Sequence, residues 1–128
     1  MTVGATTRGV TTPQGFRAAG VSAGIKRGGG LLDLALLVSD RPATAAAVFT
    51  TNRALAAPVI VSREHLVRSN GVARAIIVNS GCANACTGEE GVQAARDMAE
   101  EIARLVGCPV EQVLVASTGV IGVLLPIA

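Results

Sequence analysis

The fold of this chain is decided by residues 75–119, which read AIIVNSGCANACTGEEGVQAARDMAEEIARLVGCPVEQVLVASTG. Apolar runs over Ala75–Asn79 and Val113–Ala116 lie near its two ends, and such short runs between turn signals are typical of buried strands. Between them, apolar side chains recur at intervals of three and four residues, which predicts a helix with one buried face. These side chains are Val92, Ala95, Ala99, Ile102 and Val106. The order strand, helix, strand favours an α/β sandwich with mixed sheets.

The two ends of this helix carry their own signals. Thr87 followed by Glu90 fits a capping box, in which the threonine oxygen accepts a hydrogen bond from a free backbone N–H and the glutamate reaches back to the cap. Gly107 is a natural left-handed stop, and Pro109 prevents the helix from continuing. We therefore expect a helix that starts at Thr87 and ends before Gly107.

Upstream of residue 75, apolar stretches between turn signals predict further strands. They cover Phe16–Ile25, Leu31–Val38, Thr44–Thr50 and Pro58–Ser62, and a short helix is expected over Arg63–Ser69. Asp33 is the one discordant residue inside the second stretch. Residues 1–15 are rich in Thr and Gly and are expected to be irregular.

Composition excludes several classes of protein. The 11 basic and 9 acidic residues give a net charge of +2 with the two signs interspersed, so no cationic stripe marks a nucleic-acid groove. With 2 Phe and neither Trp nor Tyr, a platform for stacking bases is equally hard to build. No apolar run is long enough to cross a membrane, and residues 1–8 lack the apolar core of a secretory signal. The mean hydropathy of +0.53 indicates a chain that buries more surface than a free domain does, as a subunit or fragment would.

The cysteines and the single histidine carry no metal or disulfide signature. Cys82, Cys86 and Cys108 are odd in number, which argues against a disulfide framework and for the cytoplasm. A Cys-x3-Cys spacing with one distant histidine matches no structural zinc site, so no metal is expected. His65 has no neighbouring Ser or Cys motif to activate and is expected on the surface, and Gly28–Gly30 is expected to be a turn.

Two loops carry residues suited to chemistry. Residues 79–88 join a strand to the helix, and their backbone N–H groups with the helix N-terminus fit either an anion site or a simple turn and cap. Ser117–Gly122 follow the last strand, where glycine lets a carbonyl approach closely while its N–H and a neighbouring hydroxyl donate to one oxyanion. The alternative for this second loop is a polar strand end before a glycine-flanked turn. The residues alone leave the alternatives open at both loops.

Several motifs, in this order along the chain, resemble one known family. They are Gly15–Val21, Asp40–Asn52, Ala57–Val59, Val78–Gly81 followed by Ala83–Gly88, and Ser117–Gly122. The chain thereby resembles the N-terminal portion of the ornithine acetyltransferase family, also called bifunctional glutamate N-acetyltransferase/amino-acid acetyltransferase. This resemblance implies an α/β sandwich of mixed sheets flanked by helices, of which residues 1–128 form a single partial domain belonging to the α chain.

The resemblance also implies a mechanism. Family members cut themselves into an α and a β chain, and the threonine freed at the β N-terminus is the nucleophile. It takes the acetyl group from N2-acetylornithine, releasing ornithine, and passes it to glutamate; some members also accept acetyl-CoA. Such an enzyme of arginine biosynthesis is cytoplasmic, needs no cofactor and is assembled from two α and two β chains. The oxyanion hole falls on the Thr118 hydroxyl and the Gly119 N–H, while this chain holds no nucleophile and no assigned substrate-binding residue.

Two positions depart from the family pattern. Members usually carry Asn where Cys82 stands, and the chain stops at Ala128, before the expected cleavage point. We therefore expect an N-terminal fragment of α, or a truncated gene product, that is inactive alone. Two other functions stay open: a non-catalytic, partner-dependent structural module, and a related self-processing aminopeptidase with an N-terminal nucleophile.

Overall fold

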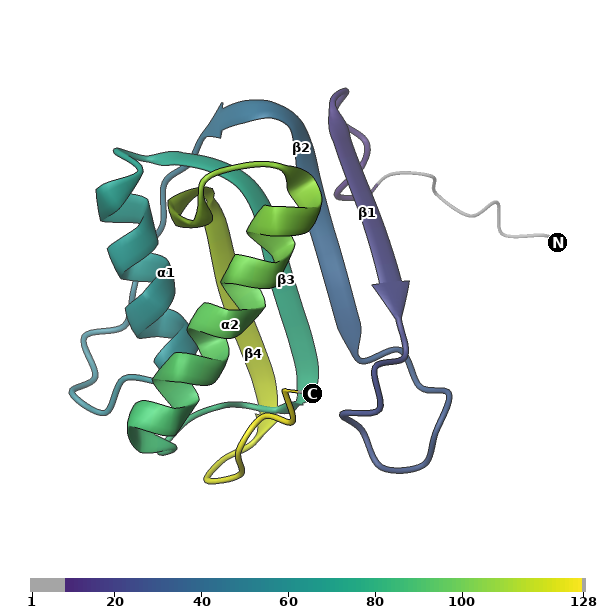
Figure 1. The fold of residues 1–128 in the computed structure, drawn as a ribbon, viewed down its shortest axis with the longest axis vertical. Coiled ribbons are helices and arrows are strands. Elements are labelled where there is room, and N and C mark those ends of the chain that lie inside the picture. Colours follow the sequence, from purple (N-terminus) through teal and green to yellow (C-terminus); the bar gives the residue numbers. More distant parts are fainter. Residues whose placement is uncertain (1–8, 128) are drawn as a thin grey trace, which may run out of the picture.

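A four-stranded mixed sheet with two helices on one face makes up residues 9–127, the part of the chain that the computed structural model describes (Figure 1). The strands are β1 (Phe16–Val21), β2 (Leu34–Thr44), β3 (Val72–Cys82) and β4 (Val113–Val120), in the spatial order β1-β2-β3-β4. The helices are α1 (Ala57–Arg68) and α2 (Gly88–Val106), and a 3-10 turn over Val110–Gln112 precedes β4. The predicted α/β class with a mixed sheet is confirmed; residues 1–8, expected to be irregular, lie outside the described residues.

The C-terminal half forms a β3–α2–β4 unit. β1, β2 and β3 pair antiparallel, whereas β3 and β4 pair parallel and so need a crossover between them. Helix α2 supplies that crossover and turns its predicted apolar stripe toward the sheet, with Ala95, Ala99 and Ile102 buried. It ends at Gly107, whose φ of 71° is left-handed as predicted.

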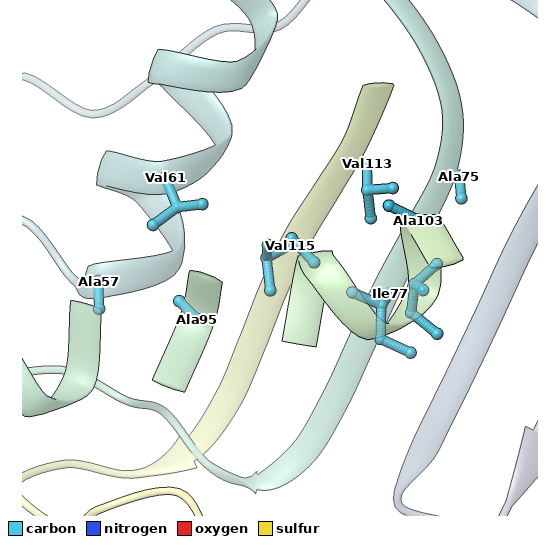
Figure 2. Close-up of a cluster of buried hydrophobic side chains, with 10 residues drawn as sticks. Ala57, Val61, Ala75, Ile77, Ala95, Ala103, Val113 and Val115 are labelled. Carbon is cyan, nitrogen blue, oxygen red and sulfur yellow. The ribbon is translucent and has the colours of Figure 1, made fainter. Parts of the chain in front are cut away.

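The core lies between the helices and the sheet and consists of small and branched side chains (Figure 2). Its buried members are Ala57, Val61, Ala75, Ile77, Ala95, Ala99, Ile102, Ala103, Val113 and Val115. Because alanines supply most of the α2 contribution, this helix packs close to the sheet and the layer fills without an aromatic ring.

The predicted strand over Pro58–Ser62 is wrong, because residues 57–68 form one continuous helix. A β-branched run favours a strand locally. Its buried residues, however, recur at helical spacing, with Ala57, Val61 and His65 each four apart on the face that meets the core and β4. Pro58 fits the first turn, where its missing N–H would have no helical partner.

The predicted strand over Thr44–Thr50 is also wrong. Residues 45–50 form no regular element, and strand β2 instead continues as far as Thr44. The continuation follows a register shift against β3 between Val38 and Ala43. Pro42 lies inside this shift and beyond the last residue that pairs with β1, so its missing N–H interrupts neither ladder.

Helix α1 is joined to β4 by two buried polar side chains. Ser62 Oγ donates to the carbonyl of Val115 at 2.7 Å and accepts from its N–H at 2.8 Å. His65 Nδ1 lies 2.8 Å from the carbonyl oxygen of Val113, an acceptor, so this nitrogen carries the proton. The expected surface position of His65 is therefore wrong: the residue is 3% exposed. These bonds cover the outer edge of β4, which in the described sheet has no further strand beside it.

We expect Ser62→Ala to lower the free energy of unfolding by about 1–3 kcal/mol, because two buried backbone groups of Val115 lose their partner. The exposed Ser22→Ala is the control and should stay within about 0.5 kcal/mol. Urea denaturation followed by circular dichroism measures both. Equal stability of the two variants would show that the Ser62 bonds contribute nothing.

Candidate functional site

The carboxyl ends of β3 and β4 bring together the two loops singled out from the sequence. In the parallel register Ser80 lies opposite Thr118 and Gly81 lies opposite Gly119, after which the register shifts at Cys82. Thr118 and Gly119 are both exposed. The predicted oxyanion residues therefore lie at an accessible end of the sheet, beside the backbone of Gly81.

Gly81 and Gly119 approach each other through their backbones. A Cβ at Gly119 would lie 2.3 Å from the carbonyl carbon of Gly81 and 2.6 Å from the backbone nitrogen of Cys82. Both glycines also adopt positive φ, +116° at Gly81 and +135° at Gly119. Two independent constraints thus require glycine at position 119: there is no space for a Cβ, and the backbone conformation is one that other residues rarely adopt.

The loop between β3 and α2 is held by the fully buried side chain of Asn84. Its Nδ2 donates to the carbonyl of Gly91 at 2.8 Å, and its Oδ1 accepts from Thr87 Oγ1 at 2.7 Å. A Cβ at Gly91 would lie 1.9 Å from Thr87 Oγ1, so this turn of α2 must pass close to the loop. The predicted capping box is wrong, because Thr87 braces Asn84 and makes no side-chain cap on α2.

Hydrogen bonds also join the end of β3 and this loop to the end of β4 and the chain that follows it. They join Ala83 N to Val120 O (2.8 Å), Gly122 N to Ala85 O (2.9 Å) and Cys82 Sγ to Val123 O (3.1 Å). The first turn of α2 already carries Glu89 and Glu90 near its positive end. Of the two interpretations of residues 79–88, these contacts favour the turn over the anion site.

A cleft of about 720 Å³ opens beside Gly81. Its walls are mainly apolar, with Ile25, Val120 and Leu124 among them, and Lys26 supplies positive charge together with Arg27. A mainly apolar cleft with a few polar groups is typical of a site for a small molecule. The cleft adjoins the strand ends that carry Thr118 and Gly119.

Asp33 fixes the loop that carries Lys26. Asp33 is 3% exposed, and its carboxylate accepts hydrogen bonds from the backbone N–H of Ala23 at 2.6 Å and of Lys26 at 2.8 Å. Its carbonyl oxygen accepts from the N–H of Ser80 at 2.8 Å. The N–H groups of Lys26 and then Ala23 hold the pKa of the Asp33 carboxyl below its ordinary value of 3.8. Asp33, the one charged residue of its apolar stretch, thus joins the loop of residues 23–26 to β3.

Within the described residues, no cluster of three or more His, Cys, Asp or Glu side chains could hold a metal ion. Cys82 is buried, Cys86 is exposed and Cys108 is intermediate, and all three are free thiols. Burial raises the pKa of the Cys108 thiol. No helix in residues 9–127 is long and apolar enough to span a membrane.

The sequence model of the ArgJ family matches residues 17–128. The chain belongs to the ArgJ family. It is 56% identical over 111 residues to the arginine biosynthesis bifunctional protein ArgJ of Nitratidesulfovibrio vulgaris, a match covering 87% of this chain and 28% of that protein. For the protein of the same name from Gloeobacter violaceus, identity is 55% over 119 residues, covering 93% of this chain and 29% of that protein. The chain therefore spans less than a third of these curated relatives.

Solved ArgJ structures share the fold. Ornithine acetyltransferase from Mycobacterium tuberculosis, crystallised with ornithine, superimposes with a TM-score of 0.84 at 48% identity, covering 92% of this chain and 63% of that chain. The arginine biosynthesis bifunctional protein ArgJ from Bacillus halodurans gives a TM-score of 0.83 at 44% identity, covering 88% and 58%. The resemblance inferred from the ordered motifs is confirmed at the level of family and fold.

Sequence reasoning missed Gly81 as the neighbour of Gly119. A signal was present, since each of the two strands has two polar residues and a glycine just before its last residue, Asn79-Ser80-Gly81 and Ser117-Thr118-Gly119. Parallel pairing aligns these triplets one for one. The matching strand ends predict the contact once the two strands are taken as neighbours.

We expect Gly119→Ala to destabilise the protein by about 4 kcal/mol or more, because the new methyl group would overlap the Gly81 backbone. Gly122→Ala is the matched control: its φ of +77° is also left-handed, but no atom lies within 4 Å of the added Cβ. It should cost only about 1–2 kcal/mol. Comparable losses in the two variants, measured by urea denaturation, would contradict the close approach.

The lowered pKa of Asp33 makes a pH prediction. A carboxyl with a depressed folded-state pKa adds stability above its unfolded pKa and loses it as the pH falls through the folded value. Asp33→Asn should therefore have a lower urea midpoint than the parent protein at pH 7. The difference should shrink as the pH falls below 3.8, where the parent carboxyl becomes protonated. A gap between the two midpoints that is the same at every pH would contradict this charge effect.

Proposed function

We propose that this chain supplies the oxyanion-binding side of an acetyltransferase of arginine biosynthesis. The reaction moves the acetyl group of N2-acetylornithine to glutamate and releases ornithine, and acetyl-CoA serves as a second acetyl donor in bifunctional members. The observation that carries the proposal is the exposed Thr118–Gly119 pair at the end of β4, held against Gly81 beside a mainly apolar cleft.

The chemistry is acyl transfer through a covalent intermediate. A threonine hydroxyl attacks the acetyl carbonyl, whose oxygen takes up the negative charge of the tetrahedral intermediate. The Thr118 hydroxyl and the Gly119 N–H donate hydrogen bonds to that oxygen. The terminal amine of the same threonine takes up the hydroxyl proton and passes it to the departing amine, so collapse releases ornithine and leaves an acetyl-threonine ester. The amine of glutamate then attacks this ester through a second oxyanion, whose collapse forms N-acetylglutamate and restores the threonine hydroxyl. Glycine at position 119 suits the role because only glycine adopts its φ of +135° readily and fits against the Gly81 backbone, and this fit fixes the position of its N–H.

The remaining parts of the proposed enzyme lie outside this chain. The nucleophile is the N-terminal threonine of a β chain produced by self-cleavage of the same precursor, and two α and two β chains form the assembly. We expect no cofactor and a cytoplasmic location. The named relatives support the biosynthetic assignment, because they are called arginine biosynthesis bifunctional proteins and one solved relative is an ornithine acetyltransferase bound to ornithine.

We expect Thr118→Ala in the full-length protein to lower kcat by about 100- to 1000-fold, because one oxyanion donor is lost. Thr118→Ser keeps the hydroxyl and should retain most of the activity. Ornithine release from N2-acetylornithine with glutamate as acceptor measures turnover. Intact mass under denaturing conditions checks that each variant is still cut into two chains, the second starting with threonine.

Unchanged turnover of Thr118→Ala would remove the oxyanion assignment. If the parent protein is never cut and shows no acetyl exchange, a structural module is the better description. Peptide hydrolysis without ornithine-dependent exchange would instead indicate an aminopeptidase.

A further inference from the structure

Two buried polar atoms at the end of the sheet lack a hydrogen-bond partner. They are Asn79 Oδ1 and Ser117 Oγ, and among the buried side-chain oxygens and nitrogens of the described residues no others are unpaired. A buried polar group without a partner is costly, so native proteins rarely leave one unsatisfied. Because both unpaired atoms lie at the same end of the sheet, we infer that they share one hydrogen-bonding arrangement.

The register places these two residues opposite each other. Asn79 on β3 faces Ser117 on β4, one position before Ser80 and Thr118. Alternation along the strands puts them on the same face, since Ile77 and Val115, two residues earlier, both lie in the core beneath α2. A serine hydroxyl has a proton to donate, and an amide oxygen accepts, so the pair is chemically complementary.

The orientation of the Asn79 amide is fixed by a second contact. Its Nδ2 donates to the carbonyl oxygen of Cys82 at 2.8 Å, and a carbonyl can only accept. The NH2 group therefore faces Cys82, and Oδ1 is left for another donor. This bond also spans Gly81, the residue whose backbone limits the position of Gly119.

We propose that Asn79 and Ser117 are positioning residues for the oxyanion site, with the Ser117 hydroxyl donating to Asn79 Oδ1 through one bridging water molecule. The proposal rests on the function assigned above to Thr118 and Gly119. Asn79 fixes the end of β3 through its bond to the Cys82 carbonyl, and Ser117 fixes the backbone of β4 directly before Thr118. Neither side chain touches the reacting atoms, because both lie on the helix-covered face.

The test uses Asn79→Ala, Ser117→Ala and the double variant of the full-length protein. Displacing an oxyanion donor raises the barrier without weakening ground-state binding, so kcat should fall roughly 10- to 100-fold while KM changes less than about twofold. Because the two residues act as one unit, the double variant should be no slower than the slower single variant. Ser117→Thr, which keeps the hydroxyl, should restore kcat.

Ser62→Ala is the matched control, since it removes another buried hydroxyl bonded to β4 but lies away from Gly119. It should lower stability and leave kcat within about twofold. Multiplicative losses of kcat in the double variant, or a loss in Ser62→Ala equal to that in Ser117→Ala, would overturn the positioning role.

Amide hydrogen exchange separates this inference from the proposed function. In both single variants the peptides covering residues 80–83 and 117–120 should exchange faster, with no such change in Ser62→Ala. This result supports the pairing even if Thr118→Ala keeps full activity, in which case the pair positions the strand ends but no oxyanion hole. If Asn79 and Ser117 do not interact, the opposite result is expected. Removing an unsatisfied hydroxyl in Ser117→Ala would then leave amide exchange in these peptides unchanged or slower, and that result would overturn the pairing.

Discussion

The backbone contact between Gly81 and Gly119 constrains the rest of this site. With a Cβ at position 119 only 2.3 Å from the Gly81 carbonyl carbon, the two strand ends can meet in this way only if residue 119 has no side chain. Parallel pairing of β3 and β4 creates the contact, and helix α2 makes that pairing possible as the crossover. The loops that leave the two strands then lie close enough to exchange the hydrogen bonds that join residues 83 and 85 to residues 120 and 122.

Buried apolar and buried polar side chains occupy different parts of the sheet and stabilise it in different ways. Alanine, valine and isoleucine fill the layer between the helices and the strands, where shape alone sets the packing. Near the carboxyl ends of β3 and β4 the buried residues become polar: Asn79 and Asn84 are both fully buried, and Asp33 is nearly so. Each of them bonds to backbone groups: Asp33 to the loop that carries Ala23 and Lys26, Asn79 to the end of β3, and Asn84 to the first turn of α2. Such bonds fix loop positions directionally, which apolar packing does not.

Some of the apolar residues lie exposed on the surface, next to the strand ends that carry Thr118 and Gly119. Val120, Ile121, Val123 and Leu124 are half or more exposed and follow Gly119 directly. Exposed apolar patches of this kind are typical of surfaces that contact another protein segment or a ligand. The high mean hydropathy therefore has two origins, the alanine-rich core and the apolar residues around the cleft.

The sequence by itself determined the β3–α2–β4 unit, the mixed α/β class and the family, because these depend on local periodicity and on several motifs in order. It also singled out Thr118 and Gly119, whose catalytic role stays a prediction. Only the tertiary structure decided that residues 57–62 are helical, that His65 is buried against Val113 and that Thr87 braces Asn84. In each case the deciding partner is a contact outside the local pattern, and such contacts outweigh propensities of a few tenths of a kcal/mol per residue. The Gly81–Gly119 approach follows the same rule, because strand pairing brings together residues that are far apart in the sequence.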